Sequence, residues 1–208
     1  QEKEQIDNQT DVIGLLSTWD YQLVTIDKPD VSESEMRSAI PWAVSTQISR
    51  PLDQVIFEYF SLPYKNTQTS KSQFMVVAAN KGTVTDFKRA IESSRMNLIS
   101  ITIPEMTCMW LMKHCYPDVD SYVLIRWLTN AAEMIIVHKG ELVLTAILPK
   151  PPVQIDAEFI NTFSLSISQL FFRFQKAMPE IETCTLPIWF GFIEGHNDEL
   201  IDFFHENF

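Results

Sequence analysis

The chain has 208 residues, of which 46% are hydrophobic and 12% are aromatic, enough for one substantial core or for two subdomains that share an interface. Lys and Arg number 16 against 27 Asp and Glu, and the net charge of −11 argues against a nucleic-acid partner, because phosphate binding needs a basic surface. The apolar runs are far shorter than the ~20 residues of a membrane span. The polar opening QEKEQIDNQT does not resemble a signal peptide. We therefore expect a soluble protein, whose membrane segment, if it has one, lies outside this sequence.

The first predicted elements follow this polar start. Val12 to Leu16 and Tyr21 to Ile26 are short β-prone runs. Ser32, followed by Glu35, forms a capping box that starts a helix. Apolar residues recur at helical spacing in this helix. Pro41 falls inside it and is expected to kink or split it, because proline removes a backbone donor.

Strands and helices then alternate. Val55 to Leu62 reads as a strand with an aromatic-rich face, and Gln73 to Ala79 as a strand whose continuous apolar run is typical of burial. Thr83 and Asp86 are the expected caps of the next helix. After it we expect a strand and a helix that proline begins, over Leu98–Ile103 and Pro104–Cys115.

The second half begins with three β-prone runs, Tyr122–Leu128, Glu133–Val137 and Leu142–Leu148. Lys139-Gly140 makes a hairpin turn between the last two. A long helical pattern over about residues 154–178 follows. Its apolar stripe comprises Ile160, Phe163, Ile167, Leu170, Phe171, Phe174 and Met178. Because Phe159, Leu165 and Phe172 fall off this stripe, we expect the helix to be covered on more than one side. A strand and an acidic helix end the chain, over Leu186–Ile193 and Asn197–Asn207.

The order of these elements indicates an α/β fold with mixed β-sheets and flanking helices. A three-strand meander followed by helix, strand and helix is the ribonuclease-H-like pattern that each half of an actin-like ATPase uses. We therefore expect an incomplete actin-like (ribonuclease-H-like) fold in two subdomains. The first half would occupy residues 1–103 and carry the capped helix with its strands as an insertion. The second, ribonuclease-H-like half would occupy residues 104–208.

Several stretches resemble the PilM- and GspL-like family, the cytoplasmic assembly proteins of type IV pilus and type II secretion machines. The stretch DYQLVTIDKPDVSESEMRSAIPW, residues 20–42, is similar to the strand-turn-helix entry of that family. The stretch that ends in Ile103-Pro104-Glu105 is similar to its strand-helix-strand. Lys139 to Leu142 and the phenylalanine-rich helix resemble its second half. Together the resemblance covers most of residues 12–208, and it is closest to the MshI branch, which serves MSHA-type pili.

The resemblance implies a part in pilus assembly in the cytoplasm, at the inner-membrane face of a Gram-negative bacterium. It also implies inner-membrane partners of the PilN and PilO kind. Membrane association would come through these partners or through segments outside this sequence, and a homodimer is left open. Two rival functions remain: an actin-like ATPase domain that lacks its first phosphate hairpin here, and a GspL-like domain of a type II secretion system.

The nucleotide motifs of actin-like ATPases are missing from the expected positions. Those proteins hold phosphates and a metal ion with two Asp-x-Gly hairpins. The first would precede the first predicted strand, and the sequence is too short to contain it; Asp11 and Gly14 bracket a strand and not a turn. The second would lie near residues 124–129, where Arg126 and Trp127 stand in place of an acidic residue and a tight turn. We therefore expect no bound cofactor and no enzymatic activity.

Metal and redox chemistry have little support in the sequence. None of the four histidines has metal-ligand spacing with a cysteine or another histidine. The odd number of cysteines, Cys108, Cys115 and Cys184, fits reduced thiols of a cytosolic protein better than a disulfide framework. We expect neither catalytic nor metal-binding residues.

The candidate partner surface lies in residues 30–62. Trp42 follows the helix proline, and Phe57, Tyr59 and Phe60 crowd the neighbouring strand. Aromatic side chains are favoured interface anchors because they bury a large area with few rotamers to freeze. The equally weighted alternative is that they fill the core beneath a kinked helix. We predict that this element receives a short segment of the inner-membrane partner, with these four aromatic residues as its contacts.

Overall fold

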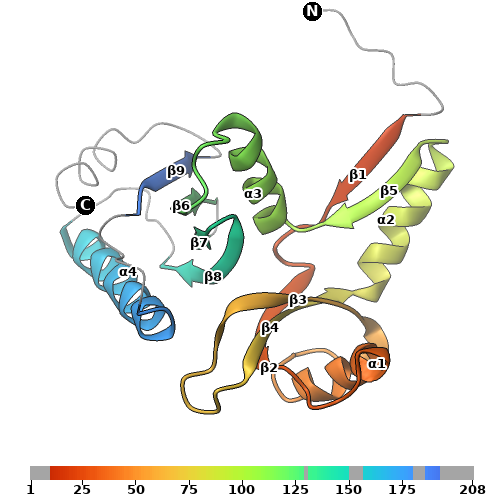
Figure 1. Ribbon diagram of the computed structural model, residues 1–208. Helices are drawn as coiled ribbons and strands as arrows, with labels where there is room; N and C mark the ends of the chain where they lie inside the picture. Colours follow the sequence, from red (N-terminus) through yellow and green to blue (C-terminus); the bar gives the residue numbers. More distant parts are fainter. Residues whose placement is uncertain (1–9, 129–130, 150–156, 180–185, 193–208) are drawn as a thin grey trace, which may run out of the picture. The chain divides into compact units, whose positions relative to one another are not determined.

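The computed structural model describes residues 10–128, 131–149, 157–179 and 186–192. The chain divides into two compact units (Figure 1). Unit 1 comprises the residues up to 62 together with 68–111, and unit 2 comprises 63–67 together with the residues from 112 onward. Each unit has a hydrophobic core of its own.

Unit 1 contains two small β-sheets. Its elements are β1 (Asp11–Leu15), β2 (Tyr21–Asp27), α1 (Glu33–Val44), a 3-10 turn (Leu52–Gln54), β3 (Val55–Lys65), β4 (Ser72–Asn80), α2 (Lys81–Ser93), β5 (Asn97–Thr102) and α3 (Pro104–Cys115). The last residues of β3 and of α3 belong to unit 2. One sheet has the strand order β2-β4-β3, and β2 is antiparallel to β4. The other consists of β1 and β5, which are parallel. The predicted strands of the first half are therefore confirmed, and β3 runs three residues past its predicted end at Leu62.

Pro41 was expected to kink or split α1, and the split does not occur: the helix continues through Pro41 to Val44. The reason is the burial of one face of the helix. Met36, Ile40 and Val44 are each at most 1% exposed, and burying an apolar side chain of this size contributes about 1.5–3 kcal/mol. Three such side chains outweigh the roughly 3 kcal/mol that an internal proline costs.

Helix α2 begins earlier than its predicted caps. Its N-cap is Asn80, whose Oδ1 accepts a hydrogen bond from the Gly82 N–H at 2.9 Å, and not Thr83 or Asp86. The reason is that β4 leads directly into α2 with no loop between them, so the last strand residue serves as the cap. The Thr83 hydroxyl instead donates to Asp20 Oδ1 at 3.2 Å.

Unit 2 is built on a four-stranded sheet with the order β8-β7-β6-β9. Its elements are β6 (Tyr122–Trp127), β7 (Ala132–His138), β8 (Glu141–Leu148), α4 (Ala157–Ala177) and β9 (Ile188–Phe192). The first three strands form the predicted antiparallel meander, and β9 pairs in parallel with β6. The predicted turn forms with positive φ angles of 51° at Lys139 and 76° at Gly140, as a type I′ hairpin requires.

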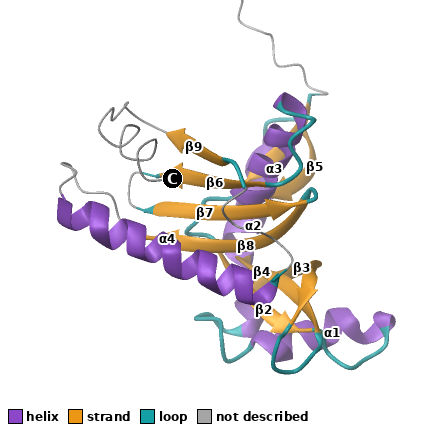
Figure 2. Cartoon of the chain, turned by 60° about the vertical axis from the view of Figure 1, so that its left-hand side comes forward, coloured by secondary structure: helices purple, strands orange, loops and turns teal. Residues whose placement is uncertain are grey.

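Helix α4 lies along one face of this sheet (Figure 2). Phe163, Ile167 and Phe174 are at most 1% exposed and join the sheet in the core of unit 2, which confirms the predicted stripe. Of the three residues off this stripe, Phe159 packs against the same core, whereas Leu165 and Phe172 are 60% and 71% exposed. The second covered side expected for this helix is therefore not formed at Leu165 and Phe172. The acidic helix predicted over residues 197–207 lies outside the described residues.

Candidate functional site

The two faces of the β2-β4-β3 sheet differ in what covers them. On one face, α1 closes a core made of Val24, Ile26, Met36, Ile40, Val44, Phe74 and Val76. The other face borders an open cleft of about 260 Å³, which we call the β3 cleft. Its lining residues are Leu16, Ile56, Glu58, Phe60, Val77, Ala79, Val84, Ile101, Thr102, Ile103 and Met106. The cleft is thus built from both sheets and both neighbouring helices of unit 1.

The β3 cleft suits an apolar ligand beside a strand. Glu58 is the one charged side chain among its lining residues, and Ile56 is 38% exposed at its margin. Within the described sheet, β3 is an edge strand that pairs with β4. Edge strands present backbone N–H and C=O groups that can accept a further strand. The site therefore offers apolar contacts and backbone hydrogen bonds side by side.

The four predicted contact residues fall into three different surroundings. Phe57 and Tyr59 point to the α1 side and pack against its core, where the Tyr59 ring stacks on Phe74 with 5.1 Å between centroids. Phe60, on the opposite face of β3, lines the cleft. Trp42 is 74% exposed on α1. The structure therefore does not bring the four together, and their part in partner binding remains a prediction.

A buried polar pair lies in the core that adjoins the cleft. Tyr21 packs with Leu16 and Ile103, and its hydroxyl donates to the Glu105 carboxylate, with 2.6 Å between Oη and Oε2. Glu105 is 2% exposed and lies in the first turn of α3, where the helix dipole favours a negative charge. The pair fixes β2 to the start of α3. No sequence signal predicts a contact between residues 84 positions apart.

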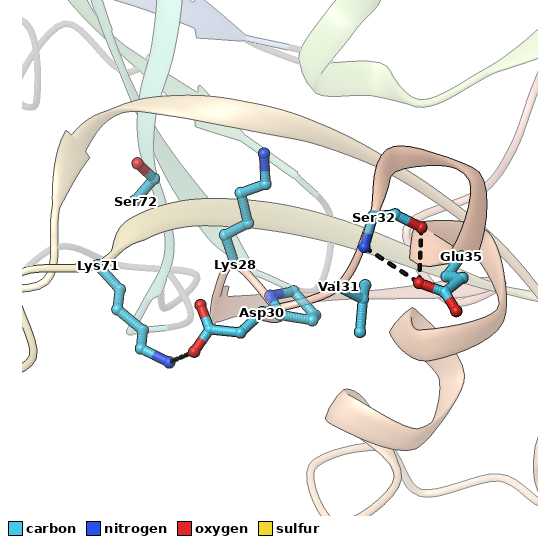
Figure 3. Close-up of a pocket in the computed structure, with 8 residues that line it drawn as sticks. Lys28, Asp30, Val31, Ser32, Glu35, Lys71 and Ser72 are labelled. Atoms are coloured by element: carbon cyan, nitrogen blue, oxygen red, sulfur yellow. Dashed lines mark hydrogen bonds and ion pairs between the residues drawn. The ribbon is translucent and has the colours of Figure 1, made fainter.

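A second, polar pocket of about 570 Å³ lies at the start of α1 (Figure 3). Here the predicted capping box forms. The Ser32 hydroxyl donates a hydrogen bond to Glu35 Oε2 at 2.6 Å, and the Ser32 backbone N–H donates to the same oxygen at 3.2 Å. Lys71 Nζ lies 2.5 Å from Asp30 Oδ2, a contact that raises the pKa of Lys71. Lys28 Nζ, the other cation of the pocket, lies 4.0 Å from a Glu33 carboxylate oxygen. Since each ammonium has a carboxylate beside it, the pocket has little net positive charge to offer a phosphate.

The residues at the expected phosphate positions are engaged in packing. Arg126 and Glu133 face each other across the β6–β7 pair, and the Arg126 Nε–H donates to Glu133 Oε2 at 2.7 Å. Their side chains are 13% and 3% exposed. Trp127 packs on Phe163, with 5.5 Å between ring centroids. On β1, a Cβ added to Gly14 would lie 2.4 Å from a ring atom of Phe87, so this glycine allows a close packing contact.

Neither a metal-binding cluster nor a membrane-spanning helix is found among the described residues. Among them, no group of three or more His, Cys, Asp or Glu side chains is placed to hold a metal ion. Cys108 and Cys115 are thiols on α3, and Cys184 lies outside the described ranges. None of the helices in those ranges is long and apolar enough to span a membrane.

Two of the solved structures that share this architecture are components of assembly systems. A chain of the PilM-PilN type IV pilus biogenesis complex matches with a TM-score of 0.55 and 14% identity, over 82% of this chain and 54% of its own length. The cytoplasmic domain of EpsL, an inner-membrane component of the type II secretion system of Vibrio cholerae, matches with a TM-score of 0.52 and 11% identity, over 89% of this chain and 63% of its own length. No protein-family model and no curated protein matches the sequence.

These likenesses concern the fold, since the identities are low. This chain spans between about half and two thirds of the length of these two structures. Its own described elements are mixed sheets with flanking helices, and unit 2 shows the meander, helix and parallel strand expected of a ribonuclease-H-like half. The predicted fold class is thereby confirmed: the chain has an actin-like α/β fold.

Proposed function

We propose that this chain is a noncatalytic docking component of a type IV pilus biogenesis machine, of the MSHA type, at the cytoplasmic face of the inner membrane. The fold that it shares with PilM and with the EpsL cytoplasmic domain supports an assembly function. The observation that carries the proposal is the β3 cleft, an apolar site beside an edge strand. Its partner would be an inner-membrane protein of the PilN or PilO kind.

The cleft indicates how such a partner would bind. A short cytoplasmic segment of a PilN-like protein would add to the edge of β3 as an extended strand, and its alternate side chains would enter the cleft. Phe60 and Ile56 would supply the apolar contacts. Glu58 would favour a basic residue in the segment; in the structure its carboxylate lies 3.4 Å from Arg37 NH1, and both side chains are exposed.

The absence of catalysis is part of the proposal. A phosphate hairpin needs backbone amides and a carboxylate turned towards the nucleotide and its metal ion. The Glu133 carboxylate instead neutralises Arg126, and Trp127 is held in the core of unit 2. These contacts support a function of this fold in assembly and not in ATP hydrolysis.

A type II secretion component of the GspL kind is the second candidate. The EpsL cytoplasmic domain matches a larger share of this chain than PilM does, 89% against 82%. The two candidates differ in the machine and in its partners, while the cleft would serve both.

The test is calorimetric titration of the chain with a synthetic peptide of the cytoplasmic segment of a PilN-like protein. We expect binding, and we expect Phe60→Ala to weaken it at least about tenfold, the loss of roughly 1.4 kcal/mol that marks an interface anchor. Trp19→Ala is the matched control, because this aromatic side chain is 67% exposed and is not among the residues that line the cleft. Trp42→Ala tests the predicted contact on α1, and circular dichroism verifies the fold of all three variants. A loss at Trp42 with none at Phe60 would move the site to the surface of α1. No binding by the unmodified chain would contradict the docking function.

A further inference from the structure

The outer surface of α4 carries a regular line of side chains. Residues seven apart on a helix differ by only about 20° in direction, so Leu165 and Phe172 lie almost in line. They are 60% and 71% exposed, opposite the stripe that packs on the sheet. Glu158, in the first turn of the helix, and Lys176, in its last turn, continue this line at its two ends.

The two apolar side chains of this line can face each other in an antiparallel pair of helices. Its midpoint falls between Ser168 and Gln169, both exposed, and Leu165 and Phe172 stand at equal distances from that midpoint. A pair of antiparallel copies of α4 with a two-fold axis at the midpoint would therefore set Leu165 against Phe172 of the partner subunit. The small Ser168 side chain at the axis permits a close approach of the two backbones.

We propose that two copies of this chain associate through α4, antiparallel, about a two-fold axis at Ser168 and Gln169. Such an interface is isologous, since the same surface serves both copies. The charges at the ends support a second copy as the occupant. With this axis Glu158 lies opposite position 179, three residues or roughly 4.5 Å along the helix from Lys176 of the partner subunit. The two long side chains can span that offset, and the symmetry repeats the contact at the other end.

The interface is small, because it holds two apolar side chains from each copy along one helix. Stable dimers bury about 800 Å² per partner, and the net charge of −11 adds repulsion between copies. The association is therefore weak and depends on concentration. It would become effective where many copies are held together, as at a membrane-bound machine.

Sedimentation velocity of the 208-residue chain over a range of concentrations, at physiological ionic strength, tests the proposal. We expect a reversible monomer–dimer equilibrium, whose dissociation constant rises at least about tenfold in Phe172→Glu. The matched control is Ile147→Glu, which changes a residue of unit 2 that is 68% exposed but lies on β8; this variant should associate like the parent. A chain that stays monomeric at millimolar concentration, or a dimer that Phe172→Glu leaves intact, overturns the proposal.

A charge exchange tests the antiparallel arrangement. Glu158→Lys and Lys176→Glu each turn both end contacts into repulsions, so each variant alone should associate more weakly than the parent, by about tenfold for two exposed pairs. Mixed together they should form a heterodimer, because each Lys then meets a Glu of the other variant. Circular dichroism confirms that both are folded, since either change also acts on the helix dipole. Two folded variants that do not associate better in the mixture than alone overturn the arrangement.

Discussion

The titration of the Glu35 carboxyl is coupled to its hydrogen bonds with Ser32 at the start of α1. The hydroxyl and the backbone N–H of Ser32 both donate to the Glu35 carboxylate, and these hydrogen bonds hold the pKa of Glu35 below its usual value. A group whose pKa is lowered on folding stabilises the fold when it is charged. Its contribution is therefore present above the ordinary carboxyl pKa and is lost as the pH falls through the lowered value.

Ser32→Ala should raise the pKa of Glu35 towards its ordinary value, because the variant removes the stronger of the two hydrogen bonds. The measurement is an NMR titration of the Glu35 side-chain carboxyl in the parent and in the variant. Ser45→Ala is the control: Ser45 caps the other end of α1, where its hydroxyl donates to the Trp42 carbonyl at 2.8 Å. An equal midpoint in Ser32→Ala and Ser45→Ala would show that the capping box does not form in solution.

At the scale of the element, α4 is the clearest case of a helix held by packing. Phe174 is 1% exposed in the core of unit 2, and deleting a buried phenylalanine costs about 3–5 kcal/mol. Phe174→Ala should lower the free energy of unfolding by this amount in urea denaturation. Gln175→Ala, at an exposed neighbour, should change it by less than about 0.5 kcal/mol. Melts of the two variants that coincide would show that α4 does not pack as described.

Most helices and strands could be predicted from the sequence, because the signals that mark them are local. Periodicity and turn chemistry located the meander, its Lys139-Gly140 turn, α3 and the inner face of α4, because each of these signals lies within a few neighbouring residues. The cap of α2 was missed because a strand leads straight into the helix at Asn80. Of the kink or split expected at Pro41, the split does not occur, because the burial of the apolar face of α1 outweighs the local preference of proline.

The candidate site could be predicted only in part. Alternation along β3 separates Phe57 and Tyr59 from Phe60, but it cannot say which face α1 covers. The β3 cleft draws its lining from strands and helices spread from Leu16 to Met106, and its neighbouring Tyr21–Glu105 contact spans 84 positions. Long-range contacts of this kind leave no trace in a single sequence.

At the scale of the whole molecule, nucleotide binding would depend on the residues at the expected phosphate positions. Nucleotide binding in this fold depends on phosphate hairpins supplied by both halves. Among the described residues, Gly14 packs beneath Phe87, and Arg126 is paired with a carboxylate that is 3% exposed. Binding ATP at Arg126 would first require breaking a buried ion pair, which costs about 3–5 kcal/mol.

We therefore expect the chain not to bind Mg-ATP. A cost of 3–5 kcal/mol reduces an affinity by roughly two to four powers of ten, enough to remove binding of ordinary strength. Isothermal titration calorimetry with Mg-ATP should show no heat beyond dilution, whereas an intact actin-like ATPase in the same buffer should give a full isotherm. A dissociation constant below about 100 μM, near −5.5 kcal/mol, would contradict the prediction. It would also favour the rival function, a nucleotide-binding domain, over a scaffold that has kept the fold for docking.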